Sequence, residues 1–216
     1  MTRGCLRCQL TTGTLCCVLT VTVLAGCGGG KRARIEPPRI DADAVGKAAL
    51  AAYDTNKDGV LSEEELAKCP ALHKARALYD KNKDGKIDAT EIADRVRRWQ
   101  ATRTGLMPVG CSVMLDGNPL EDACVELVPE VFLADSLPNA SGTTNRLGMA
   151  TLSVDRSSLP ASQRELVGVR CGLYQIRVTH PSQKIPATYN SETTLGQEVA
   201  VDNIEAVHLQ LKLKSR

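Results

Sequence analysis

Two twelve-residue segments share one pattern of oxygen-bearing side chains, and this repeat constrains the fold more than any other feature of the chain. The segments span residues 54–65 and 80–91. In each, Asp, Asn and Asp hold the first, third and fifth positions, Gly follows at the sixth, and Glu is last. Calcium takes six to eight oxygen ligands, and a short segment supplies them only by curling around the ion. The repeat therefore predicts two calcium-binding loops.

Each position of the repeat has a chemical role. The sixth-position glycines permit a sharp turn, the seventh residue offers its carbonyl, and the ninth often ligates through water. The last glutamate contributes both carboxylate oxygens. The predicted ligands of the first ion are Asp54, Asn56, Asp58, Val60, Ser62 and Glu65. Those of the second ion are Asp80, Asn82, Asp84, Lys86, Asp88 and Glu91.

Both segments resemble the EF-hand loop at every diagnostic position. The resemblance implies flanking helices and a short β-bridge between the loops through Leu61 and Ile87. Only 14 residues separate the loops, and Pro70 divides this spacer into two short helices, so we expect a compact pair with a small exposed groove, poorly suited to capturing a target helix. Short helical patterns flank the loops at Ala44–Tyr53, Glu64–Lys68, Ala71–Tyr79 and Thr90–Trp99.

Charge ranks the two loops. The first has three acidic ligands, whereas Asp88 gives the second a fourth. We therefore expect tighter binding at the second site, partly offset by Lys81, Lys83 and Lys86. Exported calcium modules typically bind at ~10⁻⁴–10⁻³ M, where calcium is plentiful, so we expect both sites to be filled structurally.

The N-terminal residues have the three parts of an export signal. Arg3 and Arg7 precede an uncharged, largely apolar run over residues 10–24, which is short for a bilayer span. The run ends in Leu24-Ala25-Gly26-Cys27, which resembles the lipobox of bacterial lipoproteins. That resemblance implies cleavage before Cys27 and acylation of this cysteine, which would anchor the protein to a membrane. The alternative is an ordinary secretory signal that happens to end near a cysteine.

The C-terminal half changes from helical periodicity to strand alternation with turns. Six or seven short strands at this spacing predict a small antiparallel β-sandwich. The clearest alternating segments are Val109–Leu115, Ala123–Val128, Met149–Val154, Leu173–Thr179 and Val207–Lys214. In the last of these, four apolar residues share one face, and the other carries His208, Gln210, Lys212 and Lys214.

The order of these segments resembles the carboxypeptidase regulatory-like domain, a transthyretin-like sandwich. The resemblance rests on LDGNPLEDACVELVP, SGTTNRLGMATLSV, GLYQIRVTH and IPATYNSETTLGQEVAVDN, of which Ile185–Asn190 is typical of planctomycete members. It covers about residues 109–214 and implies a non-catalytic module without peptidase chemistry. Cys171 before Gly172 is a departure from the pattern and suggests a local disulfide.

Composition disfavours several other functions. The net charge of +2 matches the two leader arginines, so the rest of the chain is balanced and offers no broad basic field for nucleic acid. None of the three histidines has a catalytic neighbour or metal-type spacing, and no nucleotide or nucleophile motif is present. We therefore expect a protein that is not an enzyme. Cys69, Cys111, Cys124 and Cys171 lack CxxC spacing and fit either a structural disulfide or buried free thiols.

Together these features predict an α plus β protein with two domains. The expected parts are a signal peptide (1–26), a flexible tether (27–39), an EF-hand pair (40–99), a linker (100–108) and the sandwich (109–216). We expect an exported, membrane-anchored lipoprotein, on the periplasmic face or the cell surface, with two Ca²⁺ ions and an unidentified envelope protein or polymer as partner. The alternatives are a calcium-responsive adaptor and an accessory module of an envelope enzyme.

Overall fold

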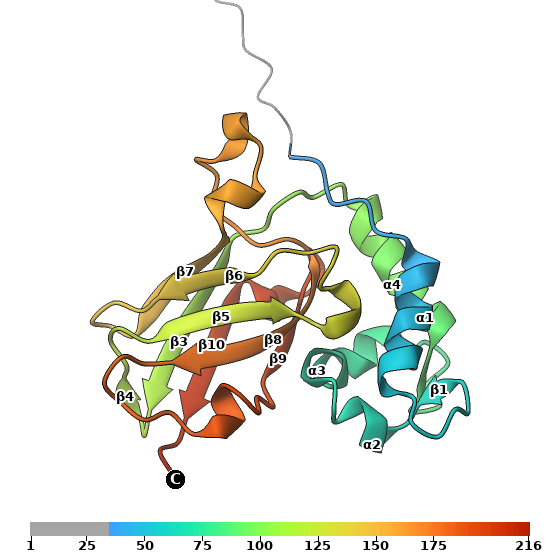
Figure 1. Ribbon diagram of the computed structural model, residues 1–216, viewed down its shortest axis with the longest axis horizontal. Helices are drawn as coiled ribbons and strands as arrows, with labels where there is room; N and C mark the ends of the chain where they lie inside the picture. The colour runs from blue at the N-terminus through green and yellow to red at the C-terminus, as the bar shows by residue number, and fades with distance from the viewer. Residues whose placement is uncertain (1–34) are drawn as a thin grey trace, which may run out of the picture. The chain divides into compact units, whose positions relative to one another are not determined.

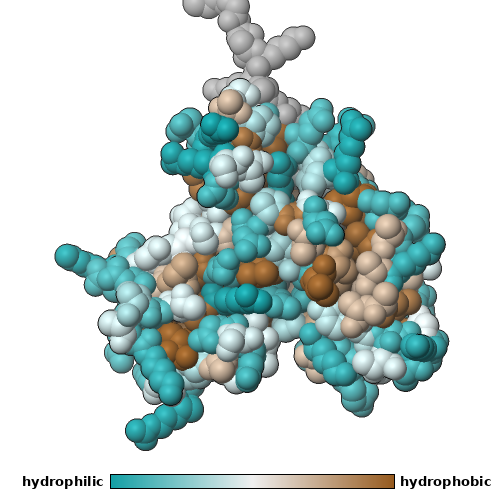
Figure 2. All heavy atoms as spheres, in the orientation of Figure 1, coloured by the Kyte–Doolittle hydropathy of each residue, from teal (hydrophilic) through white to brown (hydrophobic). Residues whose placement is uncertain are grey.

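The computed structural model describes residues 35–216 (Figure 1). The expected signal peptide and Cys27 lie outside the described residues. Within residues 35–216, no helix is both long and apolar enough to cross a bilayer. Hydrophilic side chains cover much of the face shown in Figure 2, interrupted by smaller apolar areas.

Four helices form the N-terminal part, here called the helical region, and they confirm the predicted helical segments. Asp41 caps the first helix by accepting hydrogen bonds from two backbone amides, and Pro70 occupies the first turn of the third, where its missing N–H costs nothing. Ser62 and Asp88 each form a capping box with the glutamate three residues later. The helices are α1 (Ala42–Tyr53), α2 (Glu63–Leu66), α3 (Pro70–Tyr79) and α4 (Ala89–Ala101).

The C-terminal part, here called the sheet region, is a half-barrel built from one curved sheet (Figure 1). Its strands follow the order β10-β3-β7-β6-β5-β8-β9, with the short β4 beside β3. The strands are β3 (Val109–Leu115), β4 (Asn118–Pro119), β5 (Cys124–Pro129), β6 (Ala140–Thr143), β7 (Met149–Val154), β8 (Gly172–Thr179), β9 (Gly196–Val199) and β10 (His208–Leu213).

Two details of the predicted sandwich are wrong. The strands do not separate into two stacked sheets, because β7 pairs with both β3 and β6 and so joins them into one hydrogen-bonded path. Nor is the sheet wholly antiparallel: β10 lies parallel to β3, with His208 opposite Gly110 and Leu213 opposite Leu115. The last strand returns beside the first in the same direction, a pairing that alternation within a strand does not reveal.

The face of β10 that was expected to be apolar is buried, with one exception. Leu209, Leu211 and Leu213 enter the core, whereas Val207 precedes the strand and is 49% exposed. Two strands of four residues each, β6 and β9, were not among the predicted segments. A four-residue strand is too short to show a convincing period of two, and all four residues of β9 are at least nine-tenths buried.

The segments expected to be a linker and a tether pack against the rest of the chain. Helix α4 continues to Ala101, and Met107 pairs with Val169 in an isolated bridge. The backbone of Ile35 contacts Gly105, and the carbonyl of Glu36 accepts a hydrogen bond of 2.7 Å from Arg170. Residues 35–39 and 100–108 therefore lie against the rest of the described chain.

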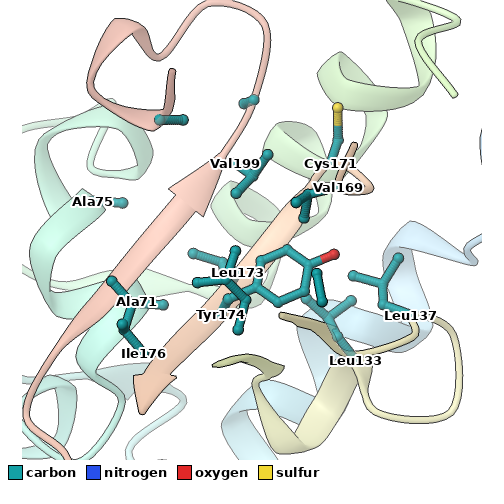
Figure 3. Packing of buried hydrophobic residues seen from close by; sticks show 14 of the residues in the cluster. Ala71, Ala75, Leu133, Leu137, Val169, Cys171, Leu173, Tyr174, Ile176 and Val199 are labelled. Carbon is teal, nitrogen blue, oxygen red and sulfur yellow. The ribbon is translucent and has the colours of Figure 1, made fainter. Parts of the chain in front are cut away.

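One hydrophobic core runs through both regions. Helix α3 lies against β8 and β9, and Figure 3 shows Ala71 and Ala75 of this helix beside Ile176 and Val199 of those strands. The close approach requires small residues: a Cβ placed at Gly196 of β9 would collide with the backbone of Ala71. The helical face that an EF-hand pair could offer to a foreign helix is thus covered by the protein's own sheet.

The four cysteines of the described part are free thiols. Cys69, Cys111 and Cys171 are buried, whereas Cys124 is exposed. The suggestion of a local disulfide at Cys171 is wrong, since the sulfur that its thiol contacts is the thioether of Met107, at 3.8 Å. Burial raises the pKa of Cys111 to about 11, and does the same for Cys171, so these thiols pack as small apolar groups.

Candidate metal centres

The first loop begins where α1 ends and is held together by its own carboxylates. Asp54 caps α1, and its carboxylate accepts hydrogen bonds from the amides of Lys57 at 2.7 Å and Gly59 at 3.0 Å. The side-chain oxygen of Asn56 accepts one from the Asp58 amide at 2.8 Å. These bonds curl residues 54–59 into a turn that brings the three side chains at alternate positions to one side of the loop.

Glu65 closes the first loop by contacting both of its ends. One of its oxygens accepts from the amide of Thr55 at 2.7 Å, and the other accepts from the amide and hydroxyl of Ser62, each at 3.0 Å. The hydrogen bond from the Ser62 amide lowers the pKa of Glu65 to about 2, although its burial acts in the opposite direction. The carboxylate is therefore ionised at any physiological pH and ready to serve as an anionic ligand.

The second loop repeats this arrangement between α3 and α4. Asp80 accepts from the amides of Asp84 at 3.1 Å and Gly85 at 3.0 Å. Glu91 bridges the loop ends, because its two oxygens accept from the amides of Lys81 at 2.9 Å and Asp88 at 3.1 Å. The closing glutamates of both loops are buried, in contrast to most acidic side chains.

The glycine at the sixth position is needed for its backbone conformation and not for space. Gly59 and Gly85 have φ angles of +86° and +81°, and a Cβ at either position would meet nothing within 4 Å. Lys57 and Lys83, at the fourth position, also have positive φ angles, of 61° and 62°. The left-handed conformation at these residues turns the loop around its centre.

A two-stranded bridge joins the loops. Strands β1 (Val60–Leu61) and β2 (Ile87–Asp88) pair antiparallel, with Leu61 opposite Ile87 and Val60 opposite Asp88. Leu61 and Ile87 are fully buried, as expected for the eighth position. The pairing links the backbone of one loop to that of the other, so the two sites form a single structural unit.

The described geometry matches a known family. The EF-hand family model matches residues 47–70 and 77–94. Residues 47–94 are an EF-hand pair. A search of curated proteins and a search of solved structures each find no match to this chain.

The donors of the EF-hand pair fit calcium. All twelve predicted ligand residues lie in the two loops and offer carboxylate, amide, hydroxyl or carbonyl oxygen, the hard donors that calcium prefers. In residues 35–216 no three acidic, histidine or cysteine side chains already surround one point. The loop carboxylates instead accept hydrogen bonds from loop amides. The set of calcium ligands is complete only when the Asn, Ser and carbonyl oxygens are included.

The lysines of the second loop are not gathered around its own ligands. Lys81 pairs with Asp94 of α4, at 2.6 Å, and Lys86 lies 3.9 Å from Asp58 of the first loop. Two of the three lysines expected to offset the negative charge of the second site therefore pair with carboxylates outside it. The histidines lie outside both loops: His73 pairs with Glu63, His180 bonds the carbonyl of Glu121, and His208 is exposed.

Sequence reasoning missed three buried charged residues that hold the EF-hand pair against the sheet. They are Arg95 in α4, Glu130 after β5, and Glu198 in β9, with exposed fractions of 2%, 0% and 0%. No local motif marks them, because their partners are far away in sequence. The available sequence signal is weak: Glu198 is a single charged residue among uncharged neighbours, between Gln197 and Val199.

Proposed function

We propose that this protein is a non-catalytic, two-site calcium-binding protein in which calcium is mainly structural. The observation that carries the proposal is the pair of twelve-residue loops, each closed by a buried glutamate and joined through β1 and β2. Calcium would lie between carboxylates that otherwise repel one another, and so would favour the closed loops. The residues that would hold it are the twelve ligands assigned above.

A structural role is supported by what surrounds the loops. Helix α2 has four residues and α3 has ten, so little helix is free to swing. The face of α3 that could receive a foreign helix already packs on β8 and β9. These observations favour stabilisation by calcium over a calcium-responsive adaptor that captures a target helix.

The remainder of the proposal concerns location and the sheet region. The sequence Leu24-Ala25-Gly26-Cys27 supports an exported lipoprotein anchored through Cys27, which lies outside the described residues. The sequence segments from LDGNPLEDACVELVP to IPATYNSETTLGQEVAVDN support a carboxypeptidase regulatory-like module that contacts an envelope protein or polymer. A Cys27→Ser variant produced in a bacterial host should lose the mass of the acyl chains and remain in the aqueous phase of a detergent partition. A variant that keeps the acyl mass and enters the detergent phase would exclude this anchor.

Calorimetric titration of the full chain with calcium tests the central claim. We expect two sites in the unaltered protein, with the tighter assigned to residues 80–91, and one site in each of Glu65→Gln and Glu91→Gln. The matched control is Glu64→Gln, which removes the same charge from the same loop at an exposed position that provides no ligand. Two unaltered sites in Glu65→Gln and Glu91→Gln, or none in the unaltered protein, would contradict the assignment.

A hydrophobic dye separates the structural role from the adaptor. If calcium is structural, adding it raises the melting temperature and leaves dye fluorescence unchanged or lower. If the protein is an adaptor, adding calcium increases dye fluorescence because new apolar surface is exposed. The same measurement on Glu64→Gln should reproduce the unaltered protein in either case.

A further inference from the structure

Two buried carboxylates from the sheet region reach into the helical region, one beside each calcium loop. Glu130 follows β5, Glu198 lies in β9, and neither has any exposed surface. An acidic group without access to water is costly unless hydrogen bonds satisfy it. We call this pair the docking carboxylates, and their partners show what they do.

Glu130 contacts the residue that precedes the first loop and the helix that follows the loop's short exit helix α2. It accepts a hydrogen bond of 3.0 Å from the hydroxyl of Tyr53, the residue directly before the first ligand Asp54. It also accepts one of 3.1 Å from the amide of Ala71, in the first turn of α3, which has no cap from its own N-cap side chain. A third bond, of 3.0 Å from Gln175, ties the same carboxylate to β8.

Glu198 holds both flanks of the second loop. It accepts a hydrogen bond of 3.1 Å from the hydroxyl of Tyr79, the residue directly before the first ligand Asp80. Arg95, one helical turn beyond the last ligand of this loop, donates two bonds to it at 2.7 and 2.8 Å. The indole of Trp99, a further turn along α4, donates another at 3.0 Å.

From the bond that each docking carboxylate accepts from the tyrosine before a loop, and from the contacts of Glu198 with α4, we infer that the sheet acts as the EF-hand pair's internal target, and that calcium binding is coupled to docking of the helical region on the sheet. The inference rests on the proposed function, since it requires that the loops bind calcium. Each loop closes when its first and last ligands approach one ion. The docking carboxylates hold the tyrosine directly before the first ligand of each loop, and Glu198 also holds α4, which carries the last ligand of the second loop.

The coupling operates in both directions. A docked sheet fixes Tyr53 and Tyr79 in the positions that a closed loop needs, so the loop loses less freedom when calcium binds. By linkage, calcium must favour the docked arrangement by the same factor by which docking raises calcium affinity. Loss of calcium would therefore loosen the contact of α3 with β8 and β9, the surface shown in Figure 3.

Single-hydroxyl variants test the coupling without touching a ligand. We expect Tyr53→Phe to weaken the first site and Tyr79→Phe to weaken the second, each by about fivefold, the lower end of typical coupling between sites. The matched control is Tyr174→Phe, because this buried tyrosine also donates a hydrogen bond, to the carbonyl of Arg170 at 3.0 Å, but within the sheet region. Calorimetric titration of the full chain with calcium gives the affinities.

Trp99 provides a second readout, because it is the sole tryptophan of the chain and is 4% exposed. Removal of calcium with a chelator should shift its emission to longer wavelength as water reaches the indole, and calcium should reverse the shift. The inference is overturned if both tyrosine variants bind as tightly as the unaltered protein, if Tyr174→Phe loses as much affinity, or if emission does not change on chelation. Failure of the unaltered protein to bind calcium would instead remove the proposed function itself.

Discussion

The surroundings of the two docking carboxylates differ, although each accepts a hydrogen bond from the tyrosine directly before a calcium loop. Glu130, on the side of the first loop, accepts hydrogen bonds from a phenol, a backbone amide and a side-chain amide, all uncharged. Glu198, on the side of the second, pairs with the guanidinium of Arg95, which is itself 2% exposed. One carboxylate is thus stabilised by neutral dipoles and the other by a buried cation.

This difference has electrostatic consequences. The Ala71 amide that bonds Glu130 lies in the first turn of α3, where the unpaired amides of a helix favour negative charge. At Glu198 the cation is shared: Arg95 also donates two hydrogen bonds of 2.7 and 2.8 Å to Asp202, whose side chain is 57% exposed. Burial alone would lower the pKa of Arg95, but its bonds to Glu198 and Asp202 raise it instead. The second cluster therefore depends on an ion pair that the first does not have.

Removal of the buried cation should have the largest effect. Arg95→Met keeps most of the side-chain volume and leaves Glu198 without its counter-charge in the core. Breaking one partner of a buried pair typically costs about 3–5 kcal/mol, and we expect the free energy of unfolding to fall by that amount. Urea denaturation, monitored by circular dichroism, measures the loss.

The control for this variant is Arg97→Met, two residues along the same helix. Arg97 pairs with Asp43 and Asp94, but its side chain is 47% exposed, and exposed pairs contribute about 0–1 kcal/mol. A loss below about 1 kcal/mol in Arg95→Met as well would mean that the ion pair is not what stabilises Glu198. The contrast between the two clusters would then disappear.

Glu130→Gln should have a smaller effect of the same kind. Glutamine preserves the shape but replaces one acceptor oxygen with a donor. Either Ala71, which bonds Oε1, or both Tyr53 and Gln175, which bond Oε2, then lose their acceptor. An unsatisfied buried group costs about 1–3 kcal/mol, and no cation is stranded. Glu126→Gln, in the same strand region but with a side chain that bonds Asn139 in an exposed position, should stay within about 0.5 kcal/mol of the unaltered protein.

The loops could be predicted from sequence because the hydrogen bonds that curl each loop are local. Asp54 and Glu65 bond amides inside a twelve-residue stretch, and Leu61 and Ile87, which pair between the loops, hold the same position in each. A motif records such interactions completely, since the chain has few ways to satisfy them. The flanking helices followed for the same reason, through caps at Ser62 and Asp88.

The arrangement of the sheet and its junction with the helices could not be predicted in this way. Alternation of apolar and polar residues along β3 or β10 predicts which face is buried but not which strand lies alongside. It therefore could not predict the parallel pairing of these two strands. The bond between Tyr53 and Glu130 spans 77 residues, and that between Arg95 and Glu198 spans 103. A lone glutamate in a strand has the same sequence signature whether it faces water or a buried arginine.

The smallest expected effect concerns the pH dependence of stability and tests Asp202, the half-exposed partner of Arg95. The hydrogen bond from Arg95 lowers the pKa of Asp202, aided by the charges of Arg95 and Arg98, so the folded state binds fewer protons than the unfolded state near pH 4. This stabilisation is complete above the ordinary aspartate range and is lost as the pH falls through the folded pKa. Because solvent screens the half-exposed carboxylate, Asp202→Asn should cost about 1 kcal/mol or less at pH 7, and less at pH 2. Urea denaturation between pH 2 and pH 7 in calcium-free buffer measures the difference. If the loss of unfolding free energy in Asp202→Asn stays constant with pH, the Asp202 side chain acts through packing, and its negative charge does not contribute to stability.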